Sequence, residues 1–170
     1  KVGSPTWSEE ELGFAAEIAG HFSKQSKIDA MRKAKVPNWE QYVDVDLMTD
    51  ILDPWGEGET SPGSSDVGDV SWVCPTLEFG TACNVLGAPG HSWAFVACAG
   101  SSIGHKSLAF AAKTMAGAAI ELLADEKLRE AVKKEHEKRL KGRAYKTPLP
   151  EGLKPPLEIA EENWEKAPKQ

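Results

Sequence analysis

The feature that most constrains the fold is a Gly-rich segment between two apolar runs. Residues 100–106, Gly-Ser-Ser-Ile-Gly-His-Lys, separate a strand-like run (95–99) from a long Ala-rich run (108–123) that has helical periodicity. This pattern predicts a strand, a turn and a helix, with His105 in the first turn of the helix. Ligand sites in open α/β sheets gather at such strand ends. The positive end of the helix favours a neutral imidazole, which is the form that binds a divalent metal.

Two segments are typical of strands covered on both faces. Residues 70–79 and 92–99 are nearly continuous apolar runs, rich in Trp, Val, Phe and Cys and flanked by glycines. We therefore predict an α/β fold with a helix-covered mixed sheet. The helix after His105 carries small and apolar side chains that suit packing on a sheet: Leu108, Ala111, Ala112, Met115, Ala119 and Leu122.

Helices are predicted elsewhere from capping signals and periodicity. Ser8 and Glu11 form a capping box before an apolar-periodic segment, residues 24–35 suit a short helix, and Asp125 caps a charged helix that ends near residue 141. The acidic, Gly- and Pro-containing stretch 44–68 predicts a long irregular loop. We expect one domain over 1–141 and a Pro-rich extended tail over 142–170.

Composition narrows the function classes. The chain has 170 residues and a net charge of −6, which gives no electrostatic reason to expect nucleic acid or an anionic membrane as a partner. No apolar run approaches the length of a transmembrane helix. Cys74, Cys83 and Cys98 lack metal-site spacing and are expected to be reduced, buried thiols of a cytoplasmic protein.

The residues alone leave several sites open. Gly100-x-Ser102-x-Gly104 matches the nucleophile elbow of serine hydrolases, but no acid and histidine follow on later strand ends, so we disfavour this class. A single histidine does not make a metal site, because catalytic zinc usually takes three protein ligands. Asp66 and Asp69, in a Gly-rich segment, can either support a metal-bound histidine or cap the next element. His91 lies at a turn just before a predicted strand.

Three sequence blocks together resemble a known family. The blocks are GSSDVGDVSWVCPTLEF, LGAPGHSWAFVACAG and SSIGHKSLAFAAKTMAGAAIELL. They are similar to the C-terminal part of the dinuclear metallopeptidases and amidohydrolases that include aminoacylases and indole-acetyl-amino-acid hydrolases, in the aminobenzoyl-glutamate branch. The resemblance covers nearly the whole chain, including the opening GSPTWSEEELGFAAEI.

The resemblance implies roles for several residues. The family holds two zinc or manganese ions bridged by water, and His105 matches its last metal ligand. Asp66 would support the metal ligands without binding the metal itself. The residue before it, which is usually Glu in relatives, is Ser65 here. His91, Ser102 and Gly104 would support the metal ligands or line the substrate pocket.

The resemblance also implies a reaction and its partners. The intact enzyme would be a metal-dependent amidohydrolase that cleaves the amide bond of an N-acyl or N-aroyl amino acid such as p-aminobenzoyl-glutamate. The remaining metal ligands and the glutamate base would lie in an N-terminal half that is missing here, as is the dimerisation domain. This chain alone is then expected to be inactive, and the whole to be a homodimer or heteromer. The alternative is a non-catalytic subunit or interaction domain with the same fold.

Overall fold

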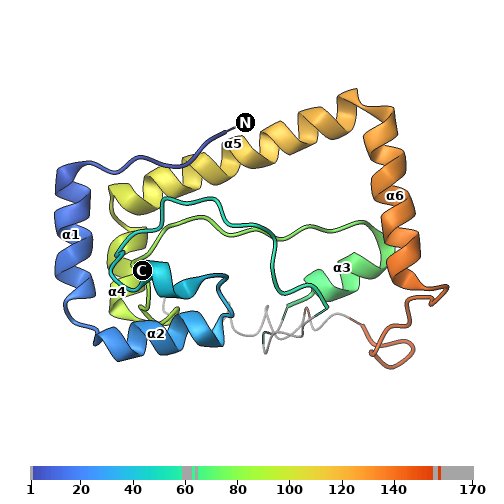
Figure 1. Cartoon of the computed structure of the whole chain (residues 1–170). Coiled ribbons are helices and arrows are strands. Elements are labelled where there is room, and N and C mark those ends of the chain that lie inside the picture. Colours follow the sequence, from blue (N-terminus) through green and yellow to red (C-terminus); the bar gives the residue numbers. More distant parts are fainter. Residues whose placement is uncertain (1, 59–62, 64, 155–156, 158–170) are drawn as a thin grey trace, which may run out of the picture.

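A computed structural model describes residues 2–58, 63, 65–154 and 157, and all regular secondary structure in this part is helical (Figure 1). The elements are α1 (Glu9–Ala19), α2 (Lys24–Lys33), the 3-10 helix η1 (Trp39–Tyr42), α3 (Val67–Val73), α4 (Trp93–Ala99), α5 (Ser102–Ala124) and α6 (Glu126–Leu140).

The predicted sheet is wrong, and the segment 92–99 shows why. The Ser92 hydroxyl accepts a hydrogen bond from the Phe95 amide and starts α4. Ala94 and Cys98 are buried, whereas Val96, which would share their face in a strand, is exposed. A short apolar run cannot be assigned to strand or helix by periodicity alone, and here the serine cap favours a helix.

The second predicted strand is also wrong. Residues 70–73 end α3, and the rest of the segment 70–79 is irregular. Apolar side chains along it remain exposed, including Val73 and Leu77. Cys74 is also exposed, so the prediction of a buried thiol is wrong for this residue. Cys98 is buried as predicted, and burial raises the pKa of its thiol.

The helices predicted from capping signals are confirmed. The Ser8 hydroxyl accepts from the Glu11 amide at 3.2 Å, and the Ser8 amide donates to the Glu11 carboxylate at 2.7 Å. The predicted short helix corresponds to α2, and Asp125 caps α6. The stretch 44–58 is irregular as predicted, and residues 142–154 contain no helix. The predicted tail beyond them falls mostly outside the described residues.

The core is small and lies at the end of the molecule where α1, α4 and the start of α5 meet (Figure 1). Its members come from these helices and from two irregular segments: Ala15, Ile18, Leu47, Val85, Ala94, Cys98 and Ile103. From this core α5 runs outward to α6, which lies beside α3 at the opposite end. The His136 ring hydrogen bonds to the Ser71 carbonyl at 2.9 Å and so joins α6 to α3.

A single residue connects α5 to α6. The Asp125 amide donates to the Glu121 carbonyl at the end of α5, and its carboxylate accepts from the Leu128 amide at the start of α6. Arg129 donates to the carbonyls of Leu122 and Leu123 at 2.8 and 2.9 Å. These bonds satisfy main-chain groups that a helix end leaves without a partner.

Candidate functional site

The residue singled out by the sequence, His105, follows a tight turn between α4 and α5. The Ser101 hydroxyl accepts from the Ile103 amide at 3.2 Å and donates to the Cys98 carbonyl at 2.7 Å. The His105 amide bonds to the Ser101 carbonyl at 3.1 Å, which places this histidine in the first turn of α5, as predicted. The element before the turn is a helix instead of the predicted strand.

Close packing of the two helices depends on Gly104. A Cβ built at this glycine would lie 2.2 Å from the Ala99 carbonyl oxygen and 2.7 Å from the Ala99 Cα. On either side of it, Ile103 and Ser107 are almost completely buried, and the Ser107 hydroxyl lies 2.6 Å from that of Thr81. The first turn of α5 is therefore held firmly against the body of the protein.

His105 itself points away from this packed side. It is exposed, and its ring makes no hydrogen bond or ion pair within the described part of the chain. A solvent-facing imidazole with no intramolecular partner can bind a metal ion or a ligand without first breaking a contact.

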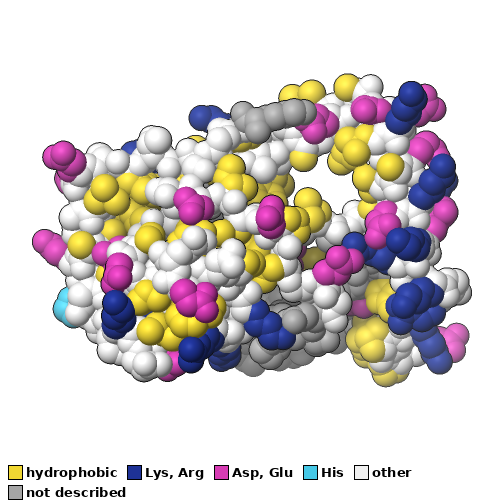
Figure 2. Space-filling view, in the orientation of Figure 1, with side chains coloured by type: hydrophobic (Ala, Val, Ile, Leu, Met, Phe, Trp, Pro, Cys, Tyr) yellow, Lys and Arg dark blue, Asp and Glu magenta, His cyan; other side chains and the backbone are white. Residues whose placement is uncertain are grey.

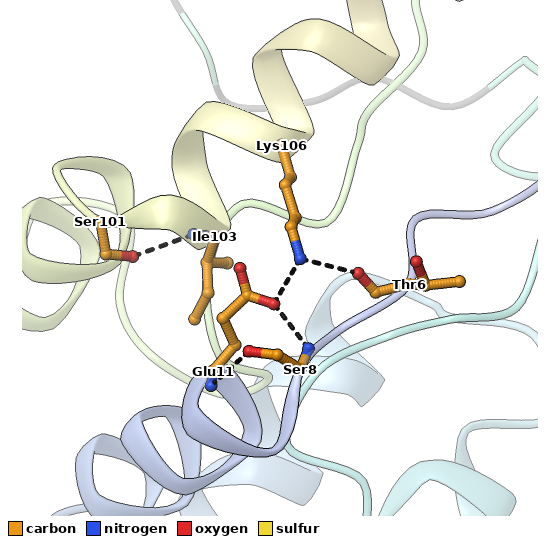
Figure 3. A network of polar contacts seen from close by, with 6 residues as sticks. All are labelled: Thr6, Ser8, Glu11, Ser101, Ile103 and Lys106. Carbon is orange, nitrogen blue, oxygen red and sulfur yellow. Dashed lines mark hydrogen bonds and ion pairs between the residues drawn. The ribbon is translucent and has the colours of Figure 1, made fainter.

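An ion pair beside His105 fixes the same turn (Figure 3). Lys106 donates to the Glu11 carboxylate at 2.7 Å and to the Thr6 carbonyl at 3.1 Å. The Lys106 ammonium, the Ser8 amide and the Ser102 hydroxyl together lower the pKa of Glu11 to about 2, although burial of the carboxylate acts in the opposite direction. The cation nearest His105 in the sequence is thus engaged with Glu11.

Asp66 and His91 do not take part in the contacts that hold the first turn of α5. Asp66 stands at the start of α3 without a side-chain capping bond, and Figure 1 shows α3 at the far end of the molecule from the first turn of α5. His91 is exposed at the turn before α4. The described structure therefore does not bring Asp66 to His105, and the roles of both Asp66 and His91 stay predictions.

Ser102 and Gly104 occupy the turn but are not arranged as a nucleophile elbow. That motif needs a strand before the serine, and a helix precedes it here. Ser102 is the exposed first residue of α5, and its hydroxyl contributes to the low pKa of Glu11. Gly104 is buried against Ala99. A contact of either residue with substrate stays a prediction.

The described residues do not form a complete metal site. Within this part of the chain, no group of three or more His, Cys, Asp or Glu side chains is placed to hold a metal ion. His105 is suited to be one ligand, because its ring is exposed and unengaged. A site of the expected kind therefore needs ligands from outside the described residues.

The sequence did not predict the bridge between Glu11 and Lys106. The capping box placed Glu11 correctly at the start of α1, but 95 residues separate it from Lys106 and no local pattern joins them.

Comparison with known proteins supports the resemblance. The chain is 28% identical over 160 residues to a subunit of p-aminobenzoyl-glutamate hydrolase from Escherichia coli strain K12, and the match covers 90% of this chain. The chain spans 33% of the length of that relative, consistent with the expected correspondence to a C-terminal part. No family model matches the chain, and no solved structure matches it.

Proposed function

We propose that this chain is part of a hydrolase that cleaves the amide bond of an N-aroyl or N-acyl amino acid such as p-aminobenzoyl-glutamate. The single observation that carries the proposal is the similarity, over nine tenths of the chain, to a protein named as a subunit of p-aminobenzoyl-glutamate hydrolase. Because the chain spans a third of that protein, the rest of the catalytic machinery is assigned to polypeptide outside it.

In this proposal His105 supplies one ligand to a metal site completed by residues outside the chain. The imidazole stands at the exposed edge of a turn that is held by Gly104 packing and by the Glu11–Lys106 ion pair. A divalent zinc or manganese ion would supply activated water for attack on the amide carbonyl. The task of this chain is to hold the backbone of the turn that carries His105 in a fixed place, so that only the imidazole ring has to be ordered when the metal binds.

Lys106 is not proposed to bind the carboxylate groups of the substrate. Its ammonium lies 2.7 Å from the Glu11 carboxylate and 3.1 Å from the Thr6 main-chain carbonyl. Releasing it would leave the buried Glu11 carboxylate without its cation, which is unfavourable. Recognition of a glutamate moiety is therefore assigned to groups outside this turn.

The test uses the protein as its source organism makes it, assayed for release of glutamate from p-aminobenzoyl-glutamate. We expect His105→Ala to lower turnover at least a hundredfold and to reduce the bound metal measured by mass spectrometry. Lys113→Gln is the control, because Lys113 is an exposed residue of the same helix. Unchanged turnover and metal content in His105→Ala, with normal circular dichroism, would contradict the role of His105.

A further inference from the structure

One face of α5 is apolar and open to solvent. The residues on it recur at alternating intervals of three and four positions, and every one is exposed: His105, Leu108, Ala112, Met115, Ala119 and Leu122. This spacing places them in one row along the helix. We call this row the α5 seam.

The opposite side of α5 packs against the rest of the protein. Ile103 and Ser107 are buried, and Phe110 and Thr114 are half-buried behind them. These residues also follow a helical spacing, so α5 has two distinct sides. The helix packs by the narrower side and leaves the more apolar one uncovered, with Leu108 72% and Met115 62% exposed.

Apolar side chains are also exposed outside the α5 seam. On α4, Val96 is 71% exposed, and Trp93 is 56% exposed although its ring packs on Phe22 and His21. Figure 2 shows hydrophobic side chains along α5 and around an opening between α5, α6 and the rest of the molecule. A continuous row of exposed large apolar side chains, in contrast to single scattered ones, is typical of an interaction site.

We propose that the α5 seam is the docking surface for polypeptide equivalent to the two thirds of the related hydrolase chain that this chain does not match. The matched region covers 90% of the chain, so α5, in its middle, lies within it. In that relative the matched segment makes up 33% of the chain. The proposal deepens the proposed function, because His105 is the first residue of the seam and a covering polypeptide would bring its own ligands to that end.

Two other occupants fit the seam less well. A second copy of α5 is less favoured because the seam has alanine at positions 112 and 119 and spans fewer than the three to four heptads that indicate a coiled coil. By length and composition alone α5 could cross a membrane, contrary to the sequence expectation. One side of α5, however, is fixed to the protein through Ile103, Ser107 and the Lys106 ion pair.

The test compares the accessibility of the seam in chain 1–170 and in the protein purified from its source through a tagged gene. Met115→Cys places a thiol on the seam, and Lys113→Cys places a matched thiol beside it; maleimide labelling is located by peptide mass. We expect Cys substituted at 115 to react in the isolated chain and at least tenfold more slowly in the source-made protein. The thiol at 113 should react in both.

Each alternative gives a different result, and each overturns the proposal. Equal reactivity at 115 in both samples means that nothing covers the seam. Protection of the isolated chain that increases with its concentration identifies a second copy, and protection by phosphatidylcholine vesicles identifies a membrane. A source-made protein of about 18.4 kDa with no other polypeptide attached also excludes the proposed occupant.

A second variant separates docking from catalysis. Met115→Glu should leave the melting temperature of the isolated chain within a degree, because this side chain is mostly exposed there. In the source-made protein the charge would be buried, and we expect a decrease of roughly 5 °C or more. Protection at 115 without hydrolysis of p-aminobenzoyl-glutamate would reject the proposed function and leave the docking surface in place.

Discussion

Replacing Gly104 by alanine tests whether the α4–α5 contact positions His105. The added Cβ would lie 2.2 Å from the Ala99 carbonyl oxygen, 2.6 Å from its carbonyl carbon and 2.7 Å from its Cα. All three are main-chain atoms, so α4 and α5 must separate. Overpacking of this kind costs about 1–3 kcal/mol, and the absence of a flexible neighbour places Gly104→Ala near the upper end.

A matched substitution in the same helix calibrates this effect. Gly117 also lies in α5, and nothing is within 4 Å of a Cβ built there. Gly117→Ala should therefore show only the gain in helix propensity, up to about 1 kcal/mol. The same gain partly offsets the clash in Gly104→Ala, which leaves a net loss of about 1–2 kcal/mol. The two variants should differ by about 2–3 kcal/mol.

Urea unfolding followed by far-ultraviolet circular dichroism measures the difference. With a slope of about 1–3 kcal/mol per molar for a protein of this size, the midpoints of the two variants should lie roughly 1 M apart. In the source-made protein Gly104→Ala should also weaken metal binding, because the first turn of α5 moves. Equal midpoints for Gly104→Ala and Gly117→Ala would refute the close-contact argument.

Three further predictions concern polar contacts. The pKa of Glu11 is lowered to about 2, chiefly by Lys106, so the stabilising contribution of its carboxylate is complete above about pH 5 and is lost as the pH falls toward 2. The urea midpoint should decrease over the same pH range, and this decrease should be absent from Glu11→Gln. Ser107→Ala should cost about 1–3 kcal/mol because it leaves the Thr81 hydroxyl without its partner, and adding Thr81→Val should recover part of that loss in a double-mutant cycle. Asp125→Ala removes the cap of α6 and should lower stability by about 1 kcal/mol, whereas an unchanged melting temperature would show that the cap is not needed.

The helices were predictable where a local signal defines them. The capping box at Ser8 and the cap at Asp125 act through neighbours three residues away, so the sequence contains everything that determines them. The first turn of α5, with His105 in it, was predictable for the same reason. The amide of this residue bonds to Ser101, four positions earlier.

The sheet was predicted wrongly because apolar content was given more weight than capping. In the segment 92–99 the burial of Ala94 and Cys98 and the exposure of Val96 depend on what the neighbouring elements cover. Composition does not specify that. The Glu11–Lys106 ion pair was missed for a related reason, since residues 95 positions apart become neighbours only through the tertiary fold.

The one-residue connection at Asp125 fixes the angle between α5 and α6. With no loop to absorb a change, inserting one residue after Asp125 would turn α6 about its axis by roughly 100° and break its contact with α3 through His136. If a polypeptide docks on the α5 seam as proposed, it must be compatible with the position of α6 at the end of the seam beside Leu122, because the one-residue connection leaves α6 little freedom to move away.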